Sequence, residues 1–371
     1  MHRYNSSEMK EASCAAPAVN EAATHPVKKR YEWIDNSRVI AAFLIMLVHL
    51  PLNDLPQVGM FDHYTLESIL KGSTYNGRVA LFLMLSGYLF GRNAGWAKTW
   101  DRFIWLLVPF VLWNLIFWGC WLLNGHAIDE VSAFQVFGIG AVFINDWEIT
   151  PAGNCYPFFD VPSWYMRDML FLTLLTPFLI KIKAHLPWIL LLFAAVWPFS
   201  FYMNPWAILS GGTCFYYGVG ILLTNFKVES AYKIFNDKLT PYVIIAFIVG
   251  IIYSVLRWKY EELLPNFCVT LPGMLIGAMM IAHCGFLIEK HLPKLSKRLA
   301  PLGPASFLVF MLHYPIFETL CSWFPALRHT YWVLLLPIPT FVVIVSLFLG
   351  MKRYTPWLMP YLGHMKIQKK S

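Results

Sequence analysis

Charged residues are scarce in this sequence. Asp, Glu, Lys and Arg make up 13% of the 371 residues, and 58% are hydrophobic, whereas soluble domains carry about 25% charged residues. This shortage argues against a water-soluble fold. Because a membrane helix needs roughly 20 apolar residues, the chain has room for about ten spans with short connections. We therefore expect an all-α polytopic membrane protein without a second soluble catalytic domain.

The sequence also lacks the motifs of metal-binding, redox and nucleic-acid-binding proteins. Its seven cysteines lie singly, with no C-x-x-C pair and no spacing that suits zinc, so we predict no metal site. A disulfide involving Cys155, Cys268 or Cys321 stays open. The net charge of +8 comes with no basic stripe or binding motif, so nucleic acid is not an expected partner. The excess of Lys and Arg indicates membrane topology instead.

The apolar residues gather into ten runs. Residues 1–30 contain no such run and no signal-peptide core, so we predict a disordered cytoplasmic tail there. A ten-helix membrane domain is predicted over 31–353 and a basic cytoplasmic tail over 354–371. The runs fall near residues 34–53, 78–92, 103–123, 162–180, 187–203, 205–224, 240–257, 265–288, 303–325 and 330–351.

The distribution of Lys and Arg predicts which loops face the cytoplasm. With ten spans and a cytoplasmic N-terminus, 22 of the 29 Lys and Arg residues lie in inner segments and four lie in outer loops. Positive-inside sorting produces this bias. Counting the short run 131–144 as an eleventh span would reverse the later loops, so we place residues 124–161 outside and both chain ends in the cytoplasm.

Arg38 and His49 form a polar pair in the first predicted span. Eleven residues separate them, which returns a helix to within roughly 20° of its starting direction about 16 Å further along. Ionisable side chains inside a membrane are expensive and mark functional sites. A histidine suits removal of a proton from a hydroxyl, a guanidinium suits a phosphate-bearing donor, and Asp35 is placed to orient Arg38. We predict a catalytic pair; a snorkelling Arg38 and a packing role for His49 are the alternatives.

Further residues near the predicted inner surface are candidates for donor binding. Arg92, Lys98 and Arg102 in the next inner loop are either topology signals or contacts to donor phosphates. Ser86, in the second span, allows either close helix packing or the approach of a substrate arm. The predicted donor contacts are therefore Arg38, Ser86, Arg92, Lys98 and Arg102.

A second group of residues is a candidate for acceptor binding. Arg78, Arg167 and Asp168 fall in the second and fourth spans, where they line an outer vestibule or form an interfacial salt bridge. Trp164 opens the fourth span, and an aromatic belt anchor is the alternative to a surface on which a sugar ring stacks. His313, in the ninth run, is a further candidate. It is a weaker functional candidate than His49, because no arginine lies on the same face of its predicted helix.

Several motifs in order resemble the membrane-bound acyltransferase family 3. The first span carries Asp35, Arg38 and His49, and the second carries Arg78 followed by Ser86-Gly87-Tyr88. Later matches are the basic loop ending at Arg102, the helix from Trp164 to Pro177, the stretch Tyr217 to Gly220, and the stretch Ser306 to Pro315 with Leu312-His313. The resemblance covers nearly the whole chain from residue 31.

The resemblance implies ten helices in a bacterial plasma membrane, with both chain ends cytoplasmic. It further implies acetyl-CoA or another acyl-CoA as donor, a hydroxyl of a surface polysaccharide or lipid-linked glycan as acceptor, and essential roles for Arg38 and His49. O-acyl transfer is therefore the leading hypothesis. An exporter of such glycans, in which the intramembrane charges line a pathway, is the alternative, and a non-catalytic assembly partner is a third. The sequence predicts no oligomeric state.

Overall fold

The computed structural model describes residues 30–52, 55, 65–66, 69–70, 77–92, 94–123, 163–200, 211–260 and 271–363. Within these residues all regular structure is helical and no strand occurs. The unit described below begins at Glu32. The predicted N-terminal tail up to residue 29 and the short run 131–144 lie outside the described residues.

Each of the ten apolar runs contains a helix. Short helices connect several of them: α10 (Ala231–Ile234), α13 (Pro293–Leu299), α16 (Met359–Gly363) and the 3-10 turns Val228–Ser230, Asp237–Leu239, Ala300–Ala305 (η6), Pro325–Leu327 and Tyr331–Leu335. The ten longer helices are α1 (Glu32–Val48), α3 (Gly77–Gly91), α4 (Trp96–Leu123), α7 (Ser163–Lys181), α8 (Leu186–Ser200), α9 (Gly211–Leu223), α11 (Thr240–Lys259), α12 (Leu271–His291), α14 (Ser306–Trp323) and α15 (Pro337–Tyr354).

Five helical segments among the described residues are long and apolar enough to cross a membrane. Two of them are α4 and α12. The other three are α11 with the 3-10 turn before it, α14 with α13 and η6 before it, and α15 with the 3-10 turn before it. The all-helical prediction is therefore confirmed for the described part of the chain. Ten crossings and the cytoplasmic placement of both ends stay predictions.

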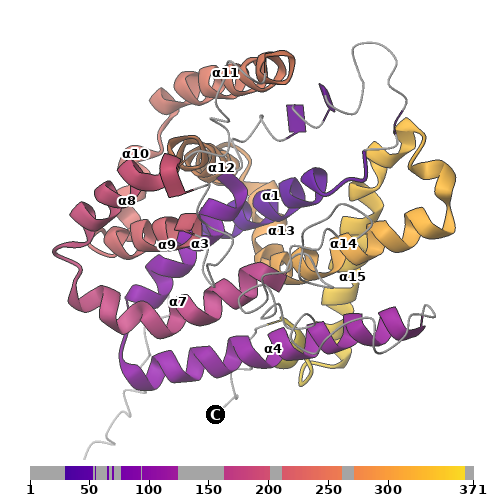
Figure 1. Cartoon of the computed structure of the whole chain (residues 1–371), viewed down its shortest axis with the longest axis horizontal. Coiled ribbons are helices and arrows are strands. Elements are labelled where there is room, and N and C mark those ends of the chain that lie inside the picture. The colour runs from indigo at the N-terminus through magenta and orange to yellow at the C-terminus, as the bar shows by residue number, and fades with distance from the viewer. Residues whose placement is uncertain are drawn as a thin grey trace, which may run out of the picture. The chain divides into compact units, whose positions relative to one another are not determined.

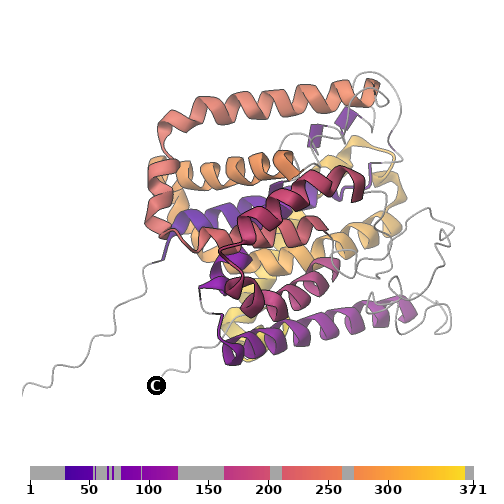
Figure 2. The ribbon, with the colours of Figure 1, turned by 60° about the vertical axis from the view of Figure 1, so that its left-hand side comes forward.

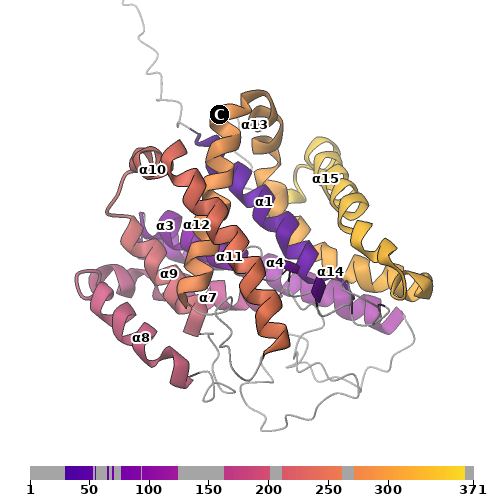
Figure 3. The same cartoon turned by 90° about the horizontal axis from the view of Figure 1, so that it is seen from above.

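Helix α1 lies between α12 and α14 (Figure 3). Glu32 and Asp35 stand in its first turn, where negative charge is favoured by the helix dipole. Pro51 disfavours the helical conformation at the residue before it, which accounts for the end of the helix at Val48. His49 therefore lies in the turn that follows α1, where its amide donates to the Met46 carbonyl at 3.2 Å, and not within the helix as the run 34–53 predicted.

The first turn of α1 is fixed by hydrogen bonds to two other helices. The amide of Trp33 donates to Oε2 of Glu289 on α12 at 2.6 Å. On α13, Ser296 Oγ donates to Glu32 at 2.5 Å and accepts from the side-chain amide of Asn36 at 2.8 Å. The bond to Glu289 satisfies a backbone amide that the helix end leaves open, and the bonds to Ser296 join side chains. They set the rotation of α1 and so the direction in which its remaining side chains point.

Glycines let α3 approach α9 closely. A Cβ added at Gly87 would meet the Tyr217 carbonyl, and one added at Gly220 would meet the backbone of Met84. Small residues at such positions allow helix backbones to pack against each other in a membrane. This contact positions Ser86, the neighbour of Gly87, relative to α7 and α9.

Helices α4 and α11 lie on opposite sides of the bundle (Figures 1 and 2). Helix α11 packs beside α12, and little of its apolar surface is buried, as expected for a helix whose outer face meets lipid. On the opposite side, α16 packs against α4, where Trp113 Nε1 donates to the Leu362 carbonyl at 3.1 Å. Part of the segment predicted as a basic tail thus forms a helix on the bundle.

The α3–α9 contact provides a test of the packing. Gly87→Ala is expected to lower the free energy of unfolding by about 1–3 kcal/mol, because overpacking forces the backbones apart. Gly350→Ala is the matched control, since a Cβ there meets open space. The measurement is the thermal unfolding midpoint of the purified protein in detergent. Equal midpoints for the two variants would contradict the close approach.

Candidate active site

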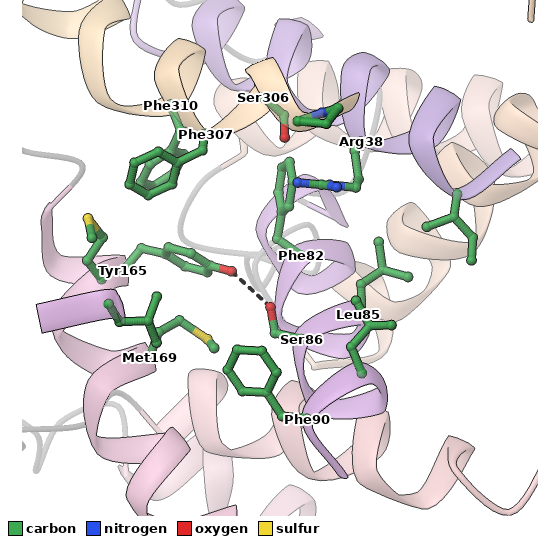
Figure 4. A pocket seen from close by; sticks show the side chains of 15 residues that line it. Arg38, Phe82, Leu85, Ser86, Phe90, Tyr165, Met169, Ser306, Phe307 and Phe310 are labelled. Atoms are coloured by element: carbon green, nitrogen blue, oxygen red, sulfur yellow. Dashed lines mark hydrogen bonds between the residues drawn. The ribbon is translucent and has the colours of Figure 1, made fainter. Parts of the chain in front are cut away.

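A pocket of about 300 Å³ is enclosed by α1, α3, α4, α7 and the start of α14. Its lining is mostly apolar and aromatic, with four polar side chains: Arg38, Ser86, Tyr165 and Ser306. Small-molecule sites commonly combine an apolar wall with a few converging polar groups. The described residues that line it are Ile34, Arg38, Phe82, Leu85, Ser86, Leu89, Phe90, Leu106, Tyr165, Met166, Met169, Pro304, Ser306, Phe307 and Phe310 (Figure 4).

Arg38 carries the positive charge of this pocket. Its guanidinium extends from α1 into the space between Phe82 and Ser306 (Figure 4). Asp35, one turn earlier, lies 3.5 Å from Nη1, as the helix spacing predicts. The Arg38 side chain keeps 31% of its surface exposed and that of Asp35 keeps 13%. An oriented, partly exposed guanidinium beside an apolar slot suits an anionic group at the end of an apolar ligand.

Ser86 and Tyr165 face each other across the pocket. The two hydroxyls are 3.4 Å apart and join α3 to α7 (Figure 4). The Tyr165 ring also packs against the Phe310 ring of α14, with centroids 5.1 Å apart. The hydroxyl pair can donate to or accept from a carbonyl or amide of a ligand.

The other predicted donor contacts lie behind or outside the pocket lining. Arg102 donates to the Phe90 carbonyl at 2.8 Å and stacks over the Phe90 ring at 4.7 Å, so it supports a lining residue. Arg92 is exposed and donates to the Tyr88 hydroxyl at 3.3 Å. Lys98 is exposed on α4. The structure thus brings Arg38 and Ser86 to one pocket, with Arg102 supporting its wall.

His49 and His313 lie side by side at the other end of α1. Their ring centroids are 5.1 Å apart with planes inclined by 51°, and the Tyr314 ring lies edge-on to His49 at 5.9 Å. His313 is fully buried, whereas His49 is half-buried. About 15 Å of helix separates Arg38 from His49. A histidine pair therefore stands where the sequence predicted a single histidine.

Phe310 contacts both the pocket and one member of the histidine pair. It lines the pocket, where its ring packs against Tyr165, and its centroid lies 6.4 Å from that of the His313 ring. Phe310 and His313 are three residues apart on α14, less than one helical turn. The histidine pair is therefore next to a residue of the pocket wall.

Of the predicted acceptor residues whose side chains the structure describes, none lines this pocket. Arg78 is buried near the start of α3. Arg167 donates to Asp168 Oδ1 at 3.0 Å, and Thr213 donates to Oδ2 of the same carboxylate at 2.9 Å. Trp164 stands in the first turn of α7, and its side chain lies outside what the structure describes. Their part in acceptor binding stays a prediction.

Several lining residues were not predicted from the sequence, among them Phe82, Phe90 and Phe310. Phe82 and Phe90 recur at every fourth position of α3 with the predicted Ser86, and Phe310 follows Ser306 by four on α14. Such spacing places side chains on one helix face. The periodicity was visible in the sequence, but in an all-apolar helix it does not show which face meets a cavity and which meets lipid.

The comparison with protein families decides the class. A family model for acyltransferase family 3, described as an acyltransferase domain, matches residues 31–351. The chain belongs to acyltransferase family 3. With the five apolar helices, this makes it a membrane acyltransferase. No curated protein matches the chain, and no solved structure does.

The buried Asp168 cluster provides a test of its structural role. Asp168→Asn is expected to lower the free energy of unfolding by about 3–5 kcal/mol, because it leaves the charge of Arg167 without its carboxylate. Thr213→Val removes one hydrogen bond to the same carboxylate and should cost about 1–3 kcal/mol. Thermal midpoints in detergent measure both. A loss of acyl transfer in Asp168→Asn with an unchanged midpoint would assign the carboxylate to substrate binding instead.

Proposed function

We propose that this acyltransferase moves an acyl group, such as acetyl, from a cytoplasmic acyl-CoA to a hydroxyl of a surface polysaccharide or lipid-linked glycan, in a bacterial plasma membrane. The observation that carries the proposal is the position of Arg38. It places one guanidinium in a narrow, mainly apolar pocket, at the opposite end of the helix from His49.

The pocket has the chemistry that an acyl thioester arm requires. A pantetheine arm is slender and largely apolar, with amides that hydrogen-bond to hydroxyls such as those of Ser86 and Tyr165. A volume of about 300 Å³ is at the lower end for small-molecule sites. The pocket therefore takes the arm and a short acyl group, while the nucleotide end stays outside. Arg38 contacts donor phosphate or an anionic group formed during transfer.

His49 is the general base in this proposal. In this proposal the acyl carbonyl reaches His49 past Phe310, which lines the pocket and lies 6.4 Å from His313, the neighbour of His49. An imidazole removes a hydroxyl proton as the oxygen attacks. The positive charge that forms lies at the carbonyl end of α1, where the helix dipole favours a cation. Donor and acceptor thus approach from opposite ends of one helix.

The acceptor enters from the side of His49. The proposed contacts there are Arg78, Trp164 and Arg167, and the buried Asp168 holds Arg167 in place. The sequence places all four toward the outer ends of α3 and α7. Sugars are bound by stacking on aromatic rings and by hydrogen bonds to charged side chains. Arg92, Lys98 and Arg102 lie at the opposite end and suit the donor's phosphates.

The exporter alternative has less support. Family membership indicates acyl transfer. In addition, the buried charges of Arg167 and Asp168 are paired with each other, whereas an exporter needs charges that line a continuous pathway.

Replacing either end of the pair tests the proposal. His49→Ala is expected to lower kcat by about 10²-fold or more, because general base catalysis is lost. Arg38→Ala is expected to raise the KM for acyl-CoA by about 10-fold or more, because a charge-assisted contact is lost. The assay follows transfer of radiolabelled acetyl from acetyl-CoA to glycan in membrane vesicles.

Matched control variants show whether the loss of any histidine or arginine, wherever it lies, lowers the activity. His329→Ala and Arg353→Ala change residues outside the pocket lining, and both should behave as the unaltered protein does. Normal transfer by His49→Ala and Arg38→Ala proteins that insert at normal levels would refute the proposal.

Phe310 provides a second test, of the path between the pocket and His49. Phe310→Trp adds volume where the arm must pass and is expected to lower kcat/KM for acetyl-CoA by about 10-fold or more, as near-attack geometry is lost. Phe310→Leu removes the ring and should transfer acetyl at least as fast as the unaltered protein. Thermal midpoints show whether either variant is misfolded. Equal rates for the Trp and Leu variants would place the path elsewhere.

A further inference from the structure

His313 is a buried histidine whose surroundings fix the state of its ring. It has no exposed surface, and the rings of Phe310 and Phe317 flank it at 6.4 and 6.1 Å. Its Nδ1 lies 2.8 Å from the Val309 carbonyl, one turn back on α14. A carbonyl oxygen only accepts hydrogen bonds, so Nδ1 carries the proton. In the neutral ring, Nε2 then bears the lone pair and must act as an acceptor.

Nε2 of His313 has no hydrogen-bond partner among the described residues. A buried acceptor without a donor is unfavourable, and such exceptions call for an explanation. The neighbouring ring that carries an N–H is His49, with its centroid 5.1 Å away. An imidazole pair joined by a hydrogen bond of about 2.9 Å has ring centroids about 5 Å apart. The separation of the two rings is therefore compatible with this bond, which requires the His49 ring to turn toward Nε2 of His313.

We propose that His313 is the positioning residue for His49: its Nε2 accepts the His49 ring N–H and so directs the other His49 nitrogen, with its lone pair, at the acceptor hydroxyl. This inference deepens the proposed acyl transfer and rests on it. In this role His313, which is fully buried, acts through His49, which is half-buried. The pairing assigns to His313 the part that a carboxylate plays in a Ser-His-Asp triad.

The transfer step balances with the residues in these roles. The acceptor O–H bond breaks, and its proton moves to the lone-pair nitrogen of His49. The acceptor oxygen forms a bond to the acyl carbon, the C–S bond of the thioester breaks, and the leaving thiolate takes the proton from His49. Throughout, the original His49 N–H stays hydrogen-bonded to Nε2 of His313. This bond stabilises the imidazolium that His49 forms during the transfer. The products are the acylated hydroxyl and the free thiol.

Two substitutions at position 313 separate positioning from packing. His313→Leu removes the acceptor and is expected to lower kcat by about 10²-fold, with the KM for acyl-CoA changed less than about 2-fold, because the base is misoriented while the donor pocket is intact. His313→Gln places an amide oxygen where it can accept from His49 and should restore kcat at least about 5-fold over the Leu variant. His283→Leu is the control for loss of a buried histidine: His283 lies on α12 and bonds Thr240 at 3.1 Å.

A spectroscopic readout on the full chain distinguishes this inference from the proposed function. ¹⁵N spectra of histidine-labelled protein in nanodiscs report which ring nitrogen of each histidine is protonated, and the His49 signals are assigned by their loss in His49→Gln. They are expected to show one tautomer in the unaltered protein and in His313→Gln, and a mixture in His313→Leu. Equal kcat for the Gln and Leu variants, or His49 signals unchanged in the Leu variant, would overturn the pairing. If the unaltered protein transferred no acyl group but His313→Leu still changed the His49 tautomer, the proposed reaction would be refuted and the His49–His313 pairing would stand.

Discussion

The hydrogen bond between the first turn of α1 and Glu289 of α12 is the constraint on which the site depends. Ser296 ties the same turn to α13, and Asp35 lies so close to Gly303 that a Cβ there would collide with its carboxylate. A helix held at its first turn by three elements cannot rotate about its axis. Arg38 is therefore directed into the pocket, and regular helix geometry places His49 about 15 Å further on.

Polar groups are concentrated at the two ends of this helix, and apolar groups separate them. At one end, Arg38, Ser86 and Tyr165 face a mainly apolar pocket; at the other, His49 and His313 stand together, and Phe310 contacts both the pocket and His313. The proposed donor and acceptor differ greatly in polarity. Two polar groups separated along one helix would suit the binding of two such substrates.

Local spacing predicted the contacts that lie within one element or across one turn. The Asp35–Arg38 pair, for example, follows from an i, i+3 spacing. In contrast, the contact between His49 and His313 could not be predicted. His313 lies on a helix far away in the sequence, and no arginine on the same helical face distinguishes it. The end of α1 at Val48 was also missed, although Pro51 is the local signal for it.

By itself the sequence determined the helical class, the positions of the ten apolar helices, the Asp35–Arg38 pair, and the family. Each of these depends on composition or on periodicity within one segment, which a chain expresses whatever its neighbours are. Only the tertiary structure decided that α3, α7 and α14 close a pocket around Arg38, that Arg167 and Asp168 pair with each other beside Thr213, and that His313 meets His49. Helices that are apolar on every face do not reveal which face packs inward, so these contacts arise from the shapes of helices that meet across the bundle.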